Sequence, residues 1–83
     1  MDKYLIEVYL PAAEKSFELH VPRDVRLADW LPVAAELLAK RSNGRFVSDE
    51  TVVLCDGETG QVYNLNQTSR ELGFQNGIRV LMI

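Results

Sequence analysis

The stretch FQNGIRVLMI, residues 74–83, closes the sequence and decides the fold. Its Asn76-Gly77 pair favours a tight turn, because glycine adopts a positive φ without strain. Five of the six residues that follow are apolar, and Arg79 carries the only charge among them. Edge strands are usually charged, short or interrupted, since their free backbone groups invite pairing with other chains. We therefore predict that residues 78–83 form a central strand with a neighbour on each side.

Two segments near the N-terminus show the alternating pattern of strands and are expected to form a hairpin. Apolar and polar residues alternate over residues 4–10 and again over residues 16–21, with Pro11 in the link between them. Alternation with period two predicts strands, and a link of about five residues predicts a hairpin. We expect the last strand to lie parallel to the first, after a right-handed crossover through a helix. The second strand and the short segment QVYN, residues 61–64, then occupy the edges of the sheet.

The crossover helix is predicted from apolar residues that recur at helical spacing. Asp24 is suited to cap its start, and Asn43-Gly44 is suited to end it. The helix should have roughly fifteen residues and a length of about 22 Å. Pro32 lies inside it, where proline removes a hydrogen bond and costs ~3 kcal/mol. Pro32 either bends one helix or makes the first turn break and restart; we favour the bend, because the apolar stripe stays in phase across it. The stripe consists of Leu27, Trp30, Leu31, Ala34 and Leu38.

The remaining segments complete an α+β fold. The β-branched and apolar residues 51–55 predict a third strand, and residues 61–65 predict a short strand at best. The sequence TSRE at residues 68–71 has the spacing of a capping box and predicts one turn of helix. One hairpin, one amphipathic helix and a central last strand make the β-grasp, the fold of ubiquitin. We expect a single ubiquitin-like domain over residues 1–83, with a mixed four- to five-stranded sheet and the main helix packed on one face.

Composition and charge exclude several classes of protein. The 83 residues carry a net charge of −3 and the nine basic residues are scattered, so we expect no nucleic-acid-binding face. One cysteine excludes an internal disulfide. No segment has the pattern of a signal peptide or approaches the ~20 apolar residues of a membrane span. We expect a cytoplasmic protein without a cofactor, which would reach a membrane only through another protein.

Two long segments resemble one known family. FELHVPRDVRLADWLPVAAELL, residues 17–38, and VYNLNQTSRELGFQNGIRVLMI, residues 62–83, are similar to the small YukD-type ubiquitin-like proteins of bacterial type VII secretion. They also resemble the ubiquitin-like cytoplasmic domain of membrane components in related actinobacterial systems. The first segment carries the pattern VP-x-D-V from Val21 and the triplet WLP at residues 30–32. The second carries an Asn-Gly turn before an apolar end. These motifs are structural, and the resemblance spans nearly the whole chain.

The resemblance implies a non-enzymatic accessory component of the secretion machinery that binds partner proteins, namely cytoplasmic parts of that machinery. One alternative is a ubiquitin-like domain of a larger membrane secretion component, and another is a self-associating module such as a homodimer. Conjugation and sulfur transfer need a flexible tail that ends in Gly-Gly, whereas this sequence ends in Met82-Ile83. A protein modifier or sulfur carrier is therefore the weaker alternative and would require processing.

Several residues have side chains capable of chemistry, and each has a simpler structural interpretation. Cys55 would need a base beside it to act as a nucleophile, so a buried core cysteine is the simpler reading. His20 lies on the outward phase of an edge strand and is expected to be exposed rather than to sense pH. Trp30 is expected in the core, with an interface role as the alternative. The loop carboxylates lack the ligand spacing of a calcium site. These carboxylates are Asp49, Glu50, Asp56 and Glu58.

The sheet face that the helix leaves uncovered is the candidate partner-binding surface. Alternation directs Val80 toward the helix and its neighbours outward. In the third strand the phase is open, and we assign Val52 and Leu54, rather than the residue after each, to the outer face. Exposed apolar clusters usually mark partner surfaces, although the same side chains could pair across strands without a partner. The expected partner-binding residues are Leu5, Leu54, Arg79, Leu81 and Ile83.

Overall fold

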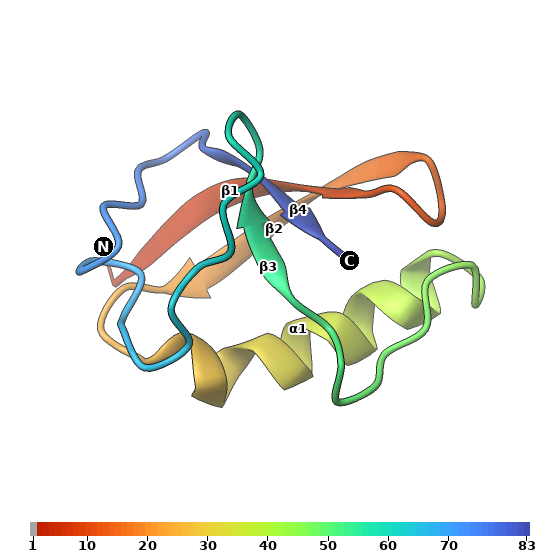
Figure 1. Ribbon diagram of the computed structural model, residues 1–83, viewed down its shortest axis with the longest axis horizontal. Coiled ribbons are helices and arrows are strands. Elements are labelled where there is room, and N and C mark those ends of the chain that lie inside the picture. The colour runs from red at the N-terminus through yellow and green to blue at the C-terminus, as the bar shows by residue number, and fades with distance from the viewer. Residues whose placement is uncertain (1) are drawn as a thin grey trace.

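The computed structural model describes residues 2–83, and this part of the chain forms four strands and one helix (Figure 1). The elements are β1 (Lys3–Leu10), β2 (Lys15–Pro22), α1 (Leu27–Arg41), β3 (Leu54–Asp56) and β4 (Arg79–Met82). The strands form one mixed sheet in the order β2-β1-β4-β3, and α1 lies across one face of it. This is the predicted α+β architecture with a four-stranded sheet.

Strand β4 lies inside the sheet, as its apolar sequence predicts. It runs parallel to β1, with Val80 beside Val8, and antiparallel to β3, with Leu81 beside Cys55. The second pairing continues beyond the strand, because Ile83 exchanges two backbone hydrogen bonds of 3.0 Å with the residue before Leu54. Backbone groups on both sides of β4 are therefore used within the chain, and this apolar segment is not an edge.

The edges of the four-stranded sheet are β2 and β3. The segment at residues 61–64 lies beside β3, as expected for an edge, but it forms no strand. In that segment only Val62 makes a bridge, opposite Cys55. The Asp56 carboxylate accepts hydrogen bonds from two backbone N–H groups of the next turn, at 2.7 and 3.1 Å. This turn reverses the chain direction, and the returning segment pairs with β3 at one residue only. Another turn begins at Asn64, whose side chain accepts a backbone N–H at 2.9 Å, and it takes the chain away from the sheet.

Strand β3 begins later than the sequence pattern predicts. The pattern indicates residues 51–55, whereas β3 covers Leu54–Asp56. The preceding residues form a turn, because the Asp49 carboxylate accepts both the N–H and the hydroxyl of Thr51, at 2.8 and 2.6 Å. A local side-chain hydrogen bond thus overrides the β propensity of the threonine.

Helix α1 is continuous from Leu27 to Arg41 and passes through Pro32, so the proline does not divide it. This agrees with the single helix that we favoured over a broken one. The helix ends where the sequence predicts, at Asn43 and Gly44, which have positive φ values of 57° and 81°. The Gly44 N–H donates to a carbonyl of the last turn at 3.0 Å.

The start of α1 differs from the prediction, because Asp24 does not cap it. The Asp24 carboxylate instead accepts two hydrogen bonds from the Arg70 guanidinium, at 2.7 and 3.1 Å. The N–H groups of the first two helical residues donate to the main-chain carbonyls of Gln67 and Leu65, at 3.0 and 2.9 Å. Donors that a helix start leaves free are thus satisfied by a distant segment of the chain.

The capping box predicted at residues 68–71 shapes that distant segment. The Thr68 N–H donates to the Glu71 carboxylate at 2.9 Å, and the Glu71 N–H donates to the Thr68 hydroxyl at 3.1 Å. The reciprocal pair closes one turn, as expected. This turn follows directly after the residues whose carbonyls cap α1.

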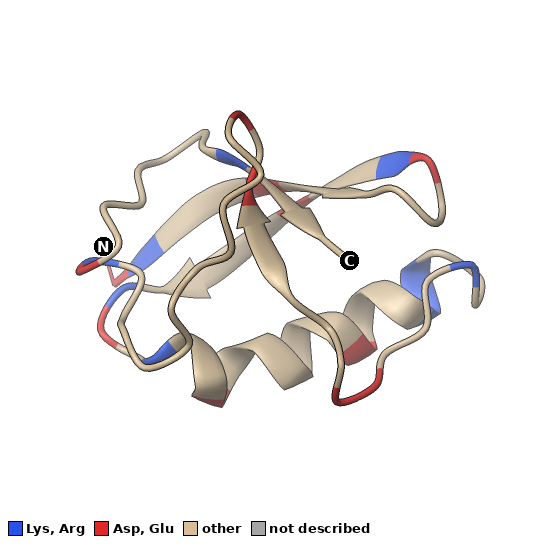
Figure 2. Cartoon of the chain, viewed as in Figure 1, with Lys and Arg blue, Asp and Glu red and all other residues tan. Residues whose placement is uncertain are grey.

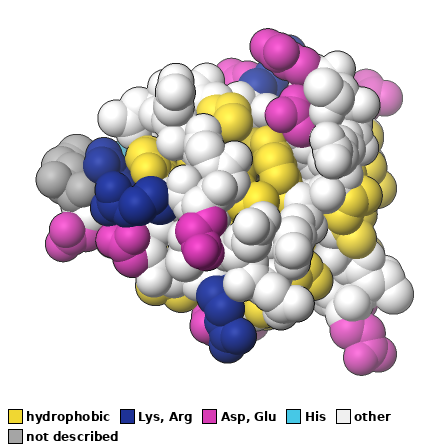
Figure 3. All heavy atoms as spheres, turned by 60° about the vertical axis from the view of Figure 1, so that its left-hand side comes forward, with side chains coloured by type: hydrophobic (Ala, Val, Ile, Leu, Met, Phe, Trp, Pro, Cys, Tyr) yellow, Lys and Arg dark blue, Asp and Glu magenta, His cyan; other side chains and the backbone are white. Residues whose placement is uncertain are grey.

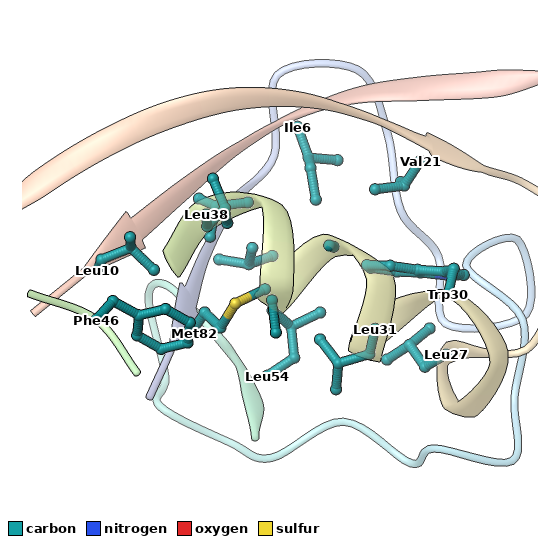
Figure 4. Packing of buried hydrophobic residues seen from close by; sticks show 14 of the residues in the cluster. Ile6, Leu10, Val21, Leu27, Trp30, Leu31, Leu38, Phe46, Leu54 and Met82 are labelled. Atoms are coloured by element: carbon teal, nitrogen blue, oxygen red, sulfur yellow. The ribbon is translucent and has the colours of Figure 1, made fainter. Parts of the chain in front are cut away.

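The hydrophobic core lies between α1 and the inner face of the sheet (Figure 4). Trp30 is 7% exposed and belongs to this core, as predicted. Burial of one large apolar side chain stabilises a fold by about 1.5–3 kcal/mol, so this layer supplies most of the driving force. The larger apolar residues that are at most 1% exposed are Ile6, Val8, Leu10, Val21, Leu27, Leu38, Leu54, Val80 and Met82.

A methyl group at Gly57 would collide with β4. It would lie 2.5 Å from the Arg79 carbonyl oxygen, which accepts the Gly57 N–H at 3.0 Å. We expect Gly57→Ala to lower the free energy of unfolding by about 2–3 kcal/mol, measured by chemical denaturation. Gly60→Ala is the control, because nothing lies within 4 Å of its added Cβ and it reports only the cost of a positive φ, about 1 kcal/mol. Equal losses in the two variants would contradict a steric role for Gly57.

Candidate functional site

The face of the sheet opposite α1 carries the candidate site. Burial in β1 and β4 alternates from residue to residue, as in strands with one face in the core. The inner residues are buried under α1, and the outer ones are half-buried or exposed. The phase predicted for these two strands is therefore confirmed. The outer residues are Leu5, Glu7, Tyr9, Arg79 and Leu81, with Ile83 next in the outward phase.

Leu54 does not belong to this face, and its assignment from the sequence is wrong. It lies opposite Met82 in the ladder, and both side chains are fully buried in the core beneath α1 (Figure 4). Val53 and Cys55 take the outer phase instead, because a shift of one residue reverses the faces of a strand. Residues 52–55 are apolar throughout, so they contain no alternation from which this phase could be read.

A charged row separates Leu5 from the other predicted residues. Glu7 and Arg79 are ladder partners, and their side chains form an ion pair with an Oε1–Nε distance of 3.0 Å. The Arg79 guanidinium also lies over the ring of Tyr9, 5.7 Å from its centroid. Leu5 lies on the other side of this row, opposite the exposed His20 of β2. The predicted residues therefore do not form a single apolar cluster.

Apolar side chains beyond the charged row form a continuous patch. Successive pairings place Tyr9, Leu81 and Val62 in one row across the sheet, with the buried Cys55 between the last two. The next row contains Val53 and Ile83. Ile83 and Val62 are 58% and 57% exposed, and the other members are half-buried. We call this set the outer patch; it consists of Tyr9, Val53, Val62, Leu81 and Ile83.

Three members of the outer patch, Tyr9, Val53 and Val62, are not among the partner-binding residues expected from the sequence. Tyr9 lies in the outward phase that the alternation in residues 4–10 predicts. Val53 is missed because the phase of β3 was assigned one residue out. Val62 reaches the patch through a single bridge that two turns create. The sequence gives no clear signal for this position, because Val62 is the one valine of a segment with weak strand character.

The residues with reactive or metal-binding side chains lie exposed, buried or within turns. His20 is exposed and the free thiol of Cys55 is buried, as predicted. Asp49 and Asp56 accept backbone N–H groups of their own turns. Within residues 2–83, no three His, Cys, Asp or Glu side chains are grouped as a metal site requires.

Charged groups are distributed over the surface with both signs side by side (Figure 2). On the side shown in Figure 3, basic side chains lie beside acidic ones, and hydrophobic side chains reach the surface between them. Two exposed ion pairs join Arg26 to Asp29 and Arg70 to Asp24. The hydrogen bond from Arg70 is the main reason that the pKa of Asp24 is lowered. This mixture of signs does not resemble the basic face that binds nucleic acid.

Tyr63 follows the bridge at Val62 and packs against the core. Its ring meets that of Phe74 edge to face, with the centroids 5.1 Å apart. Its hydroxyl donates a weak hydrogen bond to the Asp56 carboxylate at 3.4 Å. Burial, together with the negative charge of Asp56, raises the pKa of Tyr63 to about 12.

Comparison with solved structures identifies the fold. No protein-family model matches the sequence, and a comparison with curated proteins finds no match. The ubiquitin-like domain of the Mycobacterium tuberculosis type VII secretion system protein ECCD1 matches with a TM-score of 0.82 and 11% identity, over 100% of this chain and 99% of that one. The chain has the ubiquitin-like β-grasp fold.

Two further β-grasp structures come from the same kind of system. The EccD5 ubiquitin-like domain from Mycobacterium xenopi matches with a TM-score of 0.84 and 10% identity, over 100% of this chain and 94% of that one. A chain of the MycP5-free ESX-5 inner membrane complex matches with a TM-score of 0.76 and 11% identity, over 100% of this chain and 21% of that one. These neighbours agree with the resemblance to ubiquitin-like proteins of type VII secretion. No helix in residues 2–83 is long and apolar enough to cross a membrane.

The inner position of Leu54 predicts a large effect of truncation. Leu54→Ala removes a fully buried side chain and should lower the free energy of unfolding by about 2–5 kcal/mol, measured by urea denaturation. Val62→Ala, in the exposed part of the outer patch, should change it by about 0.5 kcal/mol or less. The reverse order of the two effects would show that Leu54 faces outward.

The raised pKa of Tyr63 predicts one late step in an alkaline titration. Because the folded pKa is above the ordinary value of 10.0, Tyr63 contributes stability that is complete below pH 10 and is lost as the pH rises through about 12. Tyrosinate absorbance should show one of the three tyrosines ionising late, and Asp56→Asn should lower that pKa by removing a negative charge. A late step that persists in Tyr63→Phe would assign it to another tyrosine.

Proposed function

We propose that the protein is a non-enzymatic ubiquitin-like component of a bacterial type VII secretion system that binds a protein partner through the outer patch. The observation that carries the proposal is an apolar set of side chains on the face opposite α1, two of them more than half exposed. Apolar surface gains about 25 cal/mol for each Å² removed from water, so such sets usually mark partner surfaces. The secretion context is supported by the folds that the chain resembles.

The outer patch has an apolar centre and a charged border. Leu81 and Ile83 contribute the centre, where a partner would exclude water. Arg79 lies at the border, and its guanidinium is already held by Glu7 and Tyr9, so little side-chain freedom is lost when a partner binds. Leu5 lies on the other side of the charged row. It would be contacted by a partner whose interface extends across that row.

The partners in this proposal are cytoplasmic parts of the secretion machinery, and the protein lies at the cytoplasmic side of the membrane through that complex. A chain of the ESX-5 inner membrane complex contains the same fold, which supports this placement. The proposal applies equally to a separate subunit and to a domain of a larger secretion component.

The binding is proposed to be non-covalent. Met82 is fully buried, and Ile83 exchanges two backbone hydrogen bonds with Val53. Both residues are thus held in the sheet, where Ile83 contributes an exposed side chain to the outer patch and supports contact through the sheet face. The thiol of Cys55 is buried in the same region and makes no contribution to the proposed function.

A charge placed in the outer patch tests the proposal. Leu81→Asp should reduce the secretion components captured from native cells by at least about tenfold, because a buried unpaired carboxylate opposes association. Val33→Asp is the matched control, since Val33 is 70% exposed on α1 and lies away from this face. Captured proteins are quantified by mass spectrometry, and far-UV circular dichroism checks that both variants are folded.

Two outcomes would count against partner binding through the outer patch. Undiminished capture by folded Leu81→Asp would remove the patch from the interface. A wild-type dimer in sedimentation that Leu81→Asp converts to a monomer, with capture unchanged, would assign the patch to self-association instead.

A further inference from the structure

A second surface lies beside α1, away from the outer patch. It is a groove of about 450 Å³ between the helix and the segment that leads into β3. The buried side chains of Leu31 and Ala35 contribute to its floor, and the more exposed Pro32, Val52 and Leu65 line it further out. The capping hydrogen bonds of the helix start hold the backbone of Leu65 against α1, so this side of the groove is preformed.

The charged residues that line the groove are all acidic. They are Glu36 on the helix and Asp49 and Glu50 on the facing segment, and no lysine or arginine lines it. The ion pairs formed within residues 2–83 use other carboxylates. Asp49 accepts hydrogen bonds from Thr51, which lower the pKa of its carboxyl. The groove therefore combines an apolar floor with a negative border.

Pro32 adds a polar feature to the helix side of the groove. A proline has no backbone N–H, so the carbonyl of Ala28, four residues earlier, lacks its usual partner in the helix. Both residues line the groove, since positions four apart share one face of a helix.

The shape of the surface fits a segment of chain rather than a small molecule. Beyond Glu36 and Ser48 the groove continues into a shallower hollow lined by Ala39 and Val47. Lys40 also lines this hollow, so the acidic border is confined to the groove itself. From Ala28 to Ala39 the helix rises about 16 Å, which equals three turns of a second helix. Val47 is strongly exposed along this course.

We propose that this groove binds a basic amphipathic segment of a partner protein, with apolar side chains on Leu31 and Ala35 and lysine or arginine at the acidic border. The charge of the border selects the occupant. An acidic segment would be repelled, and an uncharged one would leave three carboxylates beside an interface without counter-charges. Because the groove and the outer patch are different surfaces, the two can be occupied together.

The test uses a short synthetic helix with Leu on one face and Lys on the other, followed by amide NMR spectra of the whole chain. Addition of the peptide should shift the amide resonances of residues in the groove, namely Ala28, Glu36 and Val52. A peptide with Glu in place of Lys should bind at least about tenfold more weakly. Equal binding of the two peptides, shifts on the outer patch, or no shifts with the Lys peptide would overturn the proposal.

Variants separate the groove from the rest of the surface. The double variant Glu36→Gln with Glu50→Gln should lower the affinity for the Lys peptide by about tenfold. Glu18→Gln with Glu58→Gln is the matched control, because both residues are exposed and neither lines the groove. An equal loss of affinity in the two double variants would show that only the net charge matters, and it would overturn the proposal. Leu81→Asp should leave the peptide affinity unchanged, so the outer patch and the groove fail or succeed independently.

Discussion

The pairing of β4 on both sides is the constraint on which the rest of the structure depends. A parallel neighbour requires a long crossover, and the helix that provides it packs on one face of the sheet. The same strand sends Val80 and Met82 into the core and Arg79 and Leu81 to the opposite face. Core and candidate interface are thus two sides of one backbone. A change of register in β4 would exchange them.

A single helix covers a single face, and this asymmetry creates both the outer patch and the groove. On the outer face, the charged pair of Glu7 and Arg79 divides the sheet, so that apolar groups gather at the end where Ile83 lies. Beside the helix, two loops rather than strands complete the packing. A turn at Asp49 and a capping segment near Leu65 hold those loops close to α1 and leave a groove between them.

The structural neighbours illustrate how little sequence this fold requires. At 10–11% identity the secretion-system domains still match over the whole chain, with TM-scores of 0.82 and 0.84. Conserving a fold needs burial at the right period and turns at the right places, which many sequences provide. Function depends on particular exposed side chains, so it has to be argued from the outer patch and the groove of this chain.

The sequence by itself determined the features that local patterns encode. Alternation in residues 4–10 predicted the outer phase of β1. The apolar stripe predicted one helix that continues past Pro32, and the largely apolar residues 78–83 predicted a central strand. Tertiary structure alone decided the phase of Leu54, because a uniformly apolar run packs equally well on either face until its partners are set. It also decided that Asp24 pairs with Arg70, 46 residues away, instead of capping the helix. Periodicity is a property of neighbouring residues, whereas pairings between distant segments exist only after the chain has folded.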